Sequence, residues 1–456
     1  MNDAPEITAL LRCPSCLHGS LVRQSDDWRC AGCAAHFPEL DGIPFLFPEP
    51  ARARGEWRMR LHALLAELRR EAEQYRTALD RGPQDVLARN RLKLLAAAFD
   101  DHARRLAALL SPLGIVEPGP ALETHRALGT RIPGAQGLVS YYVNVHRDWA
   151  WGAEENEAAF QSVSEVLGPE PPGKVLVLGA GAGRLVYDLH ERLSPQMTVA
   201  LDLNPFLAFV ARRMFAGERV ALYEFPIAPR DIESHAILRT LGAGQPARRG
   251  LHLVLGDASR APFAPGSFDV VVTPWLIDVL DEDFTRFAPR VNEMLRPGGR
   301  WVNTGSLAFA HADPAARYSL EEVVKIVGQA GFAPPRVMED RWPYMWSPAS
   351  RHGRVESVVT FAAVKESDVP LPSDAALPAW LARYDQPVPA LPEFQEAALS
   401  MRVYGFVATL IDGQRSIAEI ARVLVQERLM TQDTAESAVH GFVRKLYEEA
   451  RRRTRF

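Results

Sequence analysis

The sequence predicts an α/β protein, in which a parallel sheet with helices on both faces is flanked by a small module at each end of the chain. Predominantly apolar stretches at residues 174–178, 199–202, 251–255 and 268–273 are typical of buried strands, and the first is followed by a glycine-rich turn and an amphipathic helix. All four cysteines lie within the first 33 residues. A proline-rich stretch near 370–392 separates the sheet domain from a last helical segment.

Length and composition are those of an ordinary globular protein. The 456 residues are enough for about three folded units, and 47% hydrophobic with 24% charged residues excludes wholesale disorder. No run of 18 uncharged apolar residues occurs, so we expect no membrane partner. The first 16 residues lack the basic and apolar regions of a secretory signal, so we expect a cytoplasmic location. The net charge of -4 argues against bulk attraction to nucleic acid.

The cysteines predict a metal site. Cys13 and Cys16 form one C-x-x-C pair, and Cys30 and Cys33 form a second pair after 13 intervening residues. Two such turns joined by a hairpin place four thiolates in the tetrahedral arrangement that Zn²⁺ prefers. Two disulfides or redox thiols are the alternatives, and the cytosolic character of the chain argues against both. We therefore predict a zinc ribbon over residues 1–50 with a structural Zn²⁺.

A helical connector is predicted over residues 51–135. Leu61, Leu64, Leu65 and Leu68 recur at helical spacing, and arginines and acids occupy the other faces. The arginines could form a basic surface for nucleic acid or a solvated face of an amphipathic hairpin. We favour the solvated face.

A cofactor site is predicted where the first apolar strand ends. Gly179, Gly181 and Gly183 follow that strand and precede a helix, so backbone can approach a ligand closely there. Asp202 ends the second apolar run, 19 residues past Gly183, where a carboxylate can take both ribose hydroxyls of an adenosine. This combination fits either NAD or S-adenosylmethionine.

The next stretches resemble class I S-adenosylmethionine-dependent methyltransferases. Residues 251–258 resemble their third strand with its adenine-binding acid, residues 267–275 resemble the fourth strand, and residues 292–302 resemble the turn into the fifth. The resemblance implies S-adenosylmethionine as cofactor and a Rossmann-like class I methyltransferase sheet over residues 136–368.

Three flanking motifs resemble the carnosine N-methyltransferase family over about residues 140–366. They are Arg147-Asp-Trp before the fold, Ile277-Asp278 after the fourth strand, and residues 301–307, WVNTGSL, after the fifth. The resemblance implies roles for the following residues: Asn144 and Arg147 at the carboxylate end of the cofactor, Asp202 at its ribose, Asp257 and Ala258 at its adenine, Pro274 beside the methyl group, and Asp278 at an acceptor imidazole.

The role implied for Asp278 is chemically reasonable. A carboxylate that accepts from one ring N–H fixes the imidazole tautomer and leaves the other nitrogen to attack the methyl group. The alternative is an N-cap or surface acid before the turn at residues 281–283. His311 lies one residue beyond the position of the family's substrate histidine and is our second candidate contact.

The acceptor is expected to differ from carnosine in the groups that flank its imidazole. Tyrosines that the family carries before the last strand are replaced over residues 350–356. Trp342, Tyr344 and Trp346 could line the pocket instead, or could belong to the core. We expect a small-molecule or peptide acceptor with an imidazole.

The end of the chain is predicted to be a separate module, residues 393–456, after a linker at 369–392. Ser416 and Glu419 form a capping box that opens an amphipathic helix. The stretch from Asp412 to Ile420 resembles PqqD-like winged-helix modules, which recognise leader peptides of ribosomally made natural products. The resemblance implies a leader peptide as partner, while dimerisation or a generic winged-helix role fits as well.

Two further functions stay open. An RNA methyltransferase could use the zinc ribbon for RNA binding, although the chain has no Asn-Pro-Pro-aromatic motif and no net positive charge. A non-catalytic scaffold could bind cofactor or partner without turnover. Our primary expectation is an S-adenosylmethionine-dependent N-methyltransferase.

Overall fold

The computed structural model describes residues 7–25, 27–81, 85–114, 137–311, 313–371 and 387–452. Its contacts divide the chain into two compact units, Met1–Pro372 and Ser373–Phe456. No helix in these described stretches is both long and apolar enough to cross a membrane. The cytoplasmic location stays a prediction.

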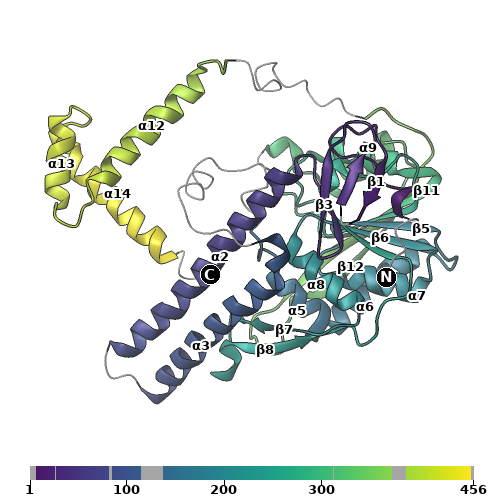
Figure 1. Cartoon of the computed structure of the whole chain (residues 1–456), viewed down its shortest axis with the longest axis horizontal. Helices are drawn as coiled ribbons and strands as arrows, with labels where there is room; N and C mark the ends of the chain where they lie inside the picture. The colour runs from purple at the N-terminus through teal and green to yellow at the C-terminus, as the bar shows by residue number, and fades with distance from the viewer. Residues whose placement is uncertain are drawn as a thin grey trace. The chain divides into compact units, whose positions relative to one another are not determined.

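The first unit, from which α2 and α3 extend in Figure 1, is built on one sheet of eleven strands. The order of the strands is β1-β2-β3-β4-β9-β6-β5-β10-β11-β13-β12. The six strands from β4 to β11 in this order run parallel, whereas β13 and β12 are antiparallel. The bounds of these strands are β4 Ile43–Leu46, β9 Leu251–Gly256, β6 Met197–Asp202, β5 Lys174–Leu178, β10 Phe268–Pro274, β11 Leu295–Gly305, β13 Arg354–Val364 and β12 Arg336–Tyr344.

Both faces of the sheet are covered, as predicted. Along β5, Val175 and Val177 contribute to one apolar core, and Leu176 and Leu178 contribute to the other. This alternation is that of a strand buried on both faces of a parallel sheet. The first core contains α6 (Ala153–Leu167), α7 (Arg184–Leu193) and α8 (Pro205–Phe215), and the second contains α9 (Phe284–Met294) and α10 (Leu320–Gln329).

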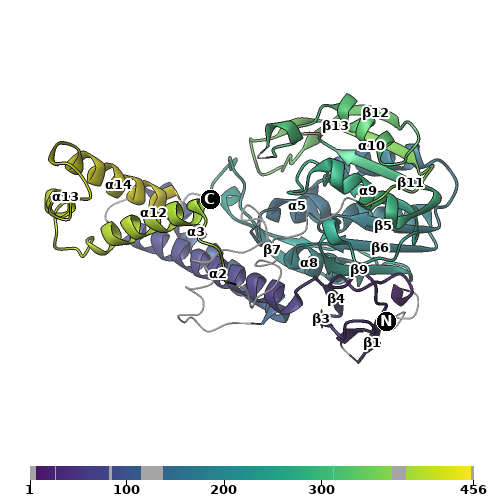
Figure 2. The ribbon, with the colours of Figure 1, turned by 90° about the horizontal axis from the view of Figure 1, so that it is seen from above.

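The N-terminal ribbon continues this sheet. Its strands are β1 (Leu21–Gln24), β2 (Asp27–Cys30) and β3 (His36–Leu40), which pair antiparallel with one another, and β3 then pairs with β4. β4 lies parallel to β9 and thereby joins the ribbon to the central strands; Figure 2 shows this end of the sheet opposite β12 and β13. The ribbon therefore belongs to the first unit and shares its second apolar core.

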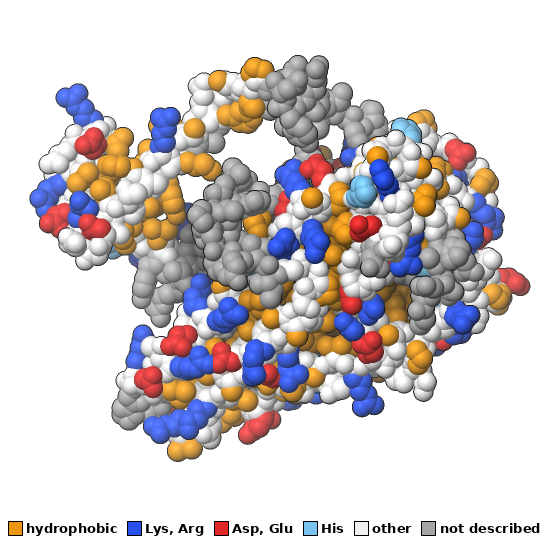
Figure 3. Space-filling view, viewed as in Figure 1, with side chains coloured by type: hydrophobic (Ala, Val, Ile, Leu, Met, Phe, Trp, Pro, Cys, Tyr) orange, Lys and Arg blue, Asp and Glu red, His pale blue; other side chains and the backbone are white. Residues whose placement is uncertain are grey.

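The predicted helical connector contains two long helices, α2 (Pro50–Asp80) and α3 (Val86–Leu109), and a short 3₁₀ turn at Ser111–Leu113. The two helices pack side by side and extend from the sheet (Figure 1). Basic and acidic side chains are interspersed along them in Figure 3, and several form ion pairs such as Arg70–Glu67. These pairs favour a solvated face. Residues 115–136 lie outside the described residues.

Short elements complete the first unit. α3 packs against β7, and the Phe99 ring stacks on the ring of Phe225, the residue after β7, with centroids 4.6 Å apart. The short elements are α5 (Tyr142–His146), the π-helical turn Arg147–Trp151, the two-stranded sheet of β7 (Val220–Glu224) and β8 (Ile237–Leu241), and 3₁₀ turns at Glu233–His235, Ala258–Arg260 and Pro314–Ala316.

The second unit contains α12 (Pro392–Thr409), α13 (Ile417–Gln426) and α14 (Gln432–Arg452). The predicted capping box is present, because Ser416 Oγ accepts from the Glu419 N–H and the Glu419 carboxylate accepts from the Ser416 N–H. A winged helix would add strands to these helices, and residues 387–452 contain none. The winged-helix form is therefore not confirmed.

Candidate cofactor and acceptor site

The glycine-rich turn after β5 has the backbone that its composition predicts. Gly179, Gly181 and Gly183 have φ angles of +70°, +60° and +85°, in the left-handed region that favours glycine. A Cβ on Gly183 would lie 2.7 Å from Cζ of Phe215, whereas a Cβ on Gly181 would meet nothing within 4 Å. Gly183 therefore allows α7 and α8 to pack closely, and Gly181 borders open space that a ligand can enter.

Asp202 lies at the end of β6, beside this turn. Its Oδ2 accepts from the Gly181 N–H at 2.7 Å, and its Oδ1 accepts from the Asn204 N–H at 2.8 Å. Burial raises the pKa of Asp202 to about 6. Each oxygen has a further lone pair, so the carboxylate can accept from two neighbouring hydroxyls.

Asp257 and Ala258 follow β9, the next strand in the sheet. Asp202 is directly opposite Leu255 in the parallel pairing of β6 and β9. Asp202 and Asp257 therefore lie near each other at the carboxyl ends of two neighbouring strands. Oδ1 of Asp257 accepts from the Ser259 N–H at 2.8 Å, and burial raises the pKa of Asp257. The structure thus brings together the residues that the sequence predicts for ribose and adenine.

The Arg147-Asp148-Trp149 motif packs on the glycine-rich turn. The Trp149 indole N–H donates to the Ala182 carbonyl at 2.8 Å, and the Arg184 guanidinium donates to the Asp148 carbonyl at 3.1 Å. These two hydrogen bonds hold the motif against the glycine-rich turn and the start of α7. Asn144 lies one turn earlier, half-buried in the wall of a cavity.

Two carboxylates hold the Arg147 guanidinium. Its Nε donates to Asp148 Oδ1 at 2.8 Å, and its Nη1 donates to Glu155 Oε1 at 3.0 Å. Burial disfavours the charged form, but Asp148 and Glu155 outweigh it and raise the pKa of Arg147. Glu155 also accepts from the Met345 N–H at 3.0 Å. Glu155 was not predicted as a site residue, because its contact with Met345 joins segments that are distant along the chain.

The end of β10 carries the predicted Pro274 and then turns sharply. Trp275 has a φ of +50°, which is uncommon for a large side chain, and its N–H donates to the Thr304 carbonyl at 2.8 Å. A Cβ on Gly305 would lie 2.9 Å from Cα of Trp275, so glycine is required opposite this turn. Asp278 follows this turn by three residues and forms hydrogen bonds with Ser306 and Ala308, just after β11.

Asp278 is buried, with 8% of its surface exposed. Its Oδ2 accepts from the Ser306 hydroxyl at 2.7 Å and from the Ala308 N–H at 3.0 Å. Burial raises the pKa of Asp278. The N-cap of α9 is Asp283, so the alternative of a surface or capping acid does not describe Asp278.

His311 lies in the segment after β11, and both of its ring nitrogens form hydrogen bonds. Its Nδ1 accepts from the Asp313 N–H at 3.1 Å, so Nε2 carries the proton and donates to the Asp281 carbonyl at 3.2 Å. Both ring nitrogens are therefore bonded within the surrounding loops, and a role for His311 in acceptor binding stays a prediction.

A cavity of about 320 Å³ lies beside Asn144. It is lined by α5, the segment after β7 and the β12–β13 connection, through residues that include Tyr141, Asn144, Glu224, Phe225, Tyr344 and Arg354. Tyr344 packs against the Trp275 ring at 4.7 Å and under the Arg354 guanidinium at 4.6 Å. Of the three aromatic candidates, Tyr344 lines the cavity, Trp342 is buried and Trp346 is exposed. Sequence reasoning missed Tyr141.

The four cysteines lie together at the base of the ribbon. Their Sγ atoms are all within 4.8 Å of one another, and the Cys13–Cys33 and Cys16–Cys30 separations are both 3.7 Å. Four thiolates about 2.3 Å from a tetrahedral Zn²⁺ would be about 3.8 Å apart. The N–H groups of Gly32 and Cys33 both point at Cys30 Sγ at 3.3 Å, as suits a thiolate. The residues fit a zinc ion.

Residues 135–342 match the family model described as carnosine N-methyltransferase. This region is an S-adenosylmethionine-dependent methyltransferase domain. A curated relative, carnosine N-methyltransferase unmet of Drosophila melanogaster, is 24% identical over 210 residues, which cover 39% of this chain and 42% of the relative. The chain thus spans less than half the length of that relative. The predicted cofactor residues, Asp278 and His311 lie inside the matched region, whereas Tyr344, Trp346 and the four cysteines lie outside it.

Solved methyltransferase structures are also similar. Phosphoethanolamine N-methyltransferase 2 of Haemonchus contortus, in complex with S-adenosyl-L-methionine, is 15% identical, with a TM-score of 0.33 and coverage of 52% of this chain and 59% of that chain. A possible histamine N-methyltransferase of Thermotoga maritima is 18% identical, with a TM-score of 0.30 and coverage of 50% and 99%. Likenesses this distant say nothing of the acceptor.

Proposed function

We propose that the protein is an S-adenosylmethionine-dependent N-methyltransferase that methylates an imidazole nitrogen of a small molecule or peptide. The observation that carries the proposal is the position of Asp278. Asp278 is a buried carboxylate that follows β10 and is held by Ser306 and Ala308. Asp202 and Asp257 likewise lie at the carboxyl ends of their strands, β6 and β9. The family match over residues 135–342 supports the same chemistry.

The cofactor would bind across the carboxyl ends of β5, β6 and β9. Asp257 and the Ala258 backbone would hold the adenine, Asp202 would hold the ribose hydroxyls, and the backbone at Gly181 would approach the cofactor through the open space beside it. Arg147 and Asn144 would hold the carboxylate end. Arg147 would do so through the guanidinium N–H groups that are not bonded to Asp148 or Glu155. Bound S-adenosylmethionine supplies a methyl group on a sulfonium, next to Pro274.

Asp278 would orient the acceptor. Its carboxylate accepts from one ring N–H, so the lone pair of the other nitrogen is available for in-line attack on the methyl carbon. A nitrogen–carbon bond forms, the carbon–sulfur bond breaks, and its electron pair stays on sulfur. The methylated ring carries one positive charge until its N–H proton leaves. Asp278 can take that proton, and burial, which raises its pKa, suits it to do so.

Mass spectrometry of candidate acceptors tests this proposal. Free histidine, histidine dipeptides and histidine-containing peptides are incubated with the full chain and S-adenosylmethionine, and a gain of one methyl group on the ring is expected. Methylation of acceptors without imidazole, with no transfer to these compounds, would contradict it. Calorimetric titration with S-adenosylhomocysteine tests cofactor binding, and binding without transfer to any acceptor would favour the non-catalytic scaffold.

The four cysteines are proposed to hold a structural Zn²⁺. Four thiolates complete its shell, so no position remains for a substrate or water. Native mass spectrometry should find one zinc per chain, and Cys33→Ser should lose it. Retention of zinc by that variant would contradict a four-thiolate site.

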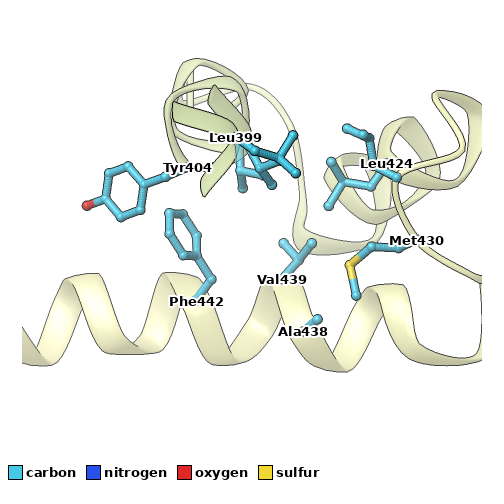
Figure 4. Close-up of a pocket in the computed structure, with 10 residues that line it drawn as sticks. Leu399, Tyr404, Leu424, Met430, Ala438, Val439 and Phe442 are labelled. Atoms are coloured by element: carbon cyan, nitrogen blue, oxygen red, sulfur yellow. The ribbon is translucent and has the colours of Figure 1, made fainter. Parts of the chain in front are cut away.

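A peptide could dock on the second unit. An apolar groove of about 490 Å³ lies between its three helices, where Leu399 and Tyr404 of α12 face Val439 and Phe442 of α14, with Met430 at one end (Figure 4). Such grooves accept the apolar side of a peptide. We propose that it binds the leader of a peptide acceptor. Deletion of residues 373–456 should then reduce turnover of a leader-containing peptide while sparing free histidine; equal turnover of the peptide would contradict this role.

The alternative of RNA binding through the ribbon finds less support. Arg23 of β1 is paired with Glu39, and Arg12 beside the first cysteine is paired with Glu293. Arginines neutralised in this way contribute little to phosphate binding. Salt-dependent binding of RNA by the full chain would restore this alternative.

A further inference from the structure

The segment that carries Asp257 and Ala258 is held by the ribbon on its N-terminal side. In the pairing of β9 with β4, Phe45 is opposite Leu255 and Leu46 is opposite Gly256. The other neighbour of β9, the strand β6, ends its pairing with Asp202 opposite Leu255. β4 is therefore the strand that still pairs with Gly256, the residue immediately before Asp257.

The same segment is held by the ribbon on its C-terminal side. The Arg12 N–H donates to the Pro262 carbonyl at 3.0 Å, and the Ala264 N–H donates to the Leu10 carbonyl at 2.8 Å. Leu11 forms a bridge with Phe263, and the side chains of both residues are buried. Within the segment, the hydrogen bonds from Ser259 and Arg260 to Asp257 shape the turn but do not attach it to the sheet.

The cysteine cluster connects these two attachments. Cys13 directly follows Arg12, and its N–H donates to the Gly19 carbonyl at 2.8 Å. The hydroxyl of Ser15, between the first two cysteines, donates to the Pro48 carbonyl just after β4 at 2.6 Å. Cys13 and Cys30 also belong to the apolar core that contains Ala258. A metal that fixes the cysteines therefore fixes both flanking segments of residues 256–263, namely residues 10–12 and β4.

We propose that the metal-loaded ribbon is a positioning element for the cofactor. It clamps residues 256–263 on both sides, so that Asp257 and Ala258 are in place before the adenine arrives. A segment that is ordered in advance loses less conformational freedom on binding, which raises the affinity. The occupancy of the ribbon's metal site thus sets the affinity for the adenine end of the cofactor. This inference rests on the proposed cofactor site.

The experiment measures binding by the full chain with and without zinc. S-Adenosylhomocysteine and 5′-methylthioadenosine, which keeps the adenine and ribose but lacks the amino-acid end, are titrated calorimetrically into zinc-loaded, chelator-treated and zinc-restored protein. We expect both ligands to lose affinity by roughly tenfold on chelation and to regain it with zinc. Unchanged affinity in zinc-free protein overturns the proposal. If zinc-loaded protein binds neither ligand, the proposed cofactor site itself is wrong.

A matched pair of variants separates the clamp from general destabilisation. Arg12→Pro removes the N–H that donates to Pro262, whereas Arg12→Ala keeps this bond and removes only the ion pair with Glu293. Both variants should retain one zinc per chain, measured by native mass spectrometry. Arg12→Pro should lower the affinity for both ligands by roughly fivefold, whereas Arg12→Ala should lower it by less than about twofold. Equal affinities for the two zinc-loaded variants would also overturn the proposal.

Discussion

The Ser306 hydroxyl donates to Oδ2 of Asp278 over 2.7 Å and thereby joins the segments that follow β10 and β11. Together with the Ala308 N–H, it fixes a buried carboxylate in one orientation. The orientation and the ionisation of Asp278 can therefore be changed separately by substitution.

Asp278→Asn should reduce the rate of methyl transfer by about 10²- to 10⁴-fold, because the amide cannot accept a proton from the ring. The affinity for S-adenosylhomocysteine should stay within about twofold, since we place Asp278 on the acceptor side. Steady-state rates and calorimetry measure the two effects. Asp281→Asn, an exposed acid three residues further on, is the matched control and should leave the rate unchanged. Loss of cofactor affinity in Asp278→Asn would contradict the assignment.

Ser306→Ala should shift the pH dependence of the rate. The Ser306 hydrogen bond stabilises the charged carboxylate and so lowers the pKa of Asp278, against the burial that raises it. Removing the hydroxyl should raise this pKa further. The reaction needs ionised Asp278, so the rate should fall on the acid side of the pH profile. In Ser306→Ala this fall should occur at a higher pH than in the wild type. An unchanged acid limb of the pH–rate profile would show that Asp278 does not titrate in the reaction.

Cofactor affinity should fall as the pH drops through about 6. Burial raises the pKa of Asp202 to about 6, and only the ionised form can accept from both ribose hydroxyls. Without cofactor, the folded state binds more protons than the unfolded chain between about pH 4 and pH 6, so the free energy of unfolding decreases as the pH rises across this window. Calorimetric titration from pH 5 to 8 measures the affinity. In Asp202→Asn this pH dependence should disappear; its persistence would identify another group.

Two glycines of the same turn should respond differently to alanine. Gly181→Ala and Gly183→Ala share the left-handed φ, so each loses roughly 1–2 kcal/mol of stability for that reason. Gly183→Ala adds a methyl 2.7 Å from Phe215 and should lose about 1–3 kcal/mol more. In thermal unfolding, Gly183→Ala should therefore have a lower midpoint temperature than Gly181→Ala.

Gly181→Ala should instead lower the affinity for S-adenosylhomocysteine, because the alanine methyl group would enter the open space that we assign to the cofactor. A loss of roughly tenfold, measured by calorimetry, is expected from close approach at this position. Wild-type affinity in this variant would mean that the cofactor does not pass over Gly181.

The parts of the fold that the sequence predicted depend on local pattern. The apolar run before Gly179 predicts β5, and the left-handed glycines after it predict the turn, because both properties depend on neighbouring residues. The capping box of Ser416 and Glu419 is local in the same way. The cysteine spacing also predicted which side chains meet, since two short turns determine it.

Relationships between distant segments were not predicted. The pairing of β4 with β9 joins residues 43–46 to residues 251–256, and no spacing rule connects them. A signal was present, because all four residues of β4 are apolar and buried, as in a strand covered on both faces. The interaction of Glu155 with Arg147 and Met345 depends likewise on folding of the whole domain. His311 was assigned from sequence position, which does not specify where its ring nitrogens point.

The position of β4 has a further consequence for the protein in solution. Without β4, the outer side of β9 would present unpaired N–H and C=O groups to other molecules, and such an open edge recruits strands from neighbouring copies. The ribbon thus also protects against self-association. Protein produced without zinc should form oligomers and aggregates, in addition to binding the cofactor more weakly.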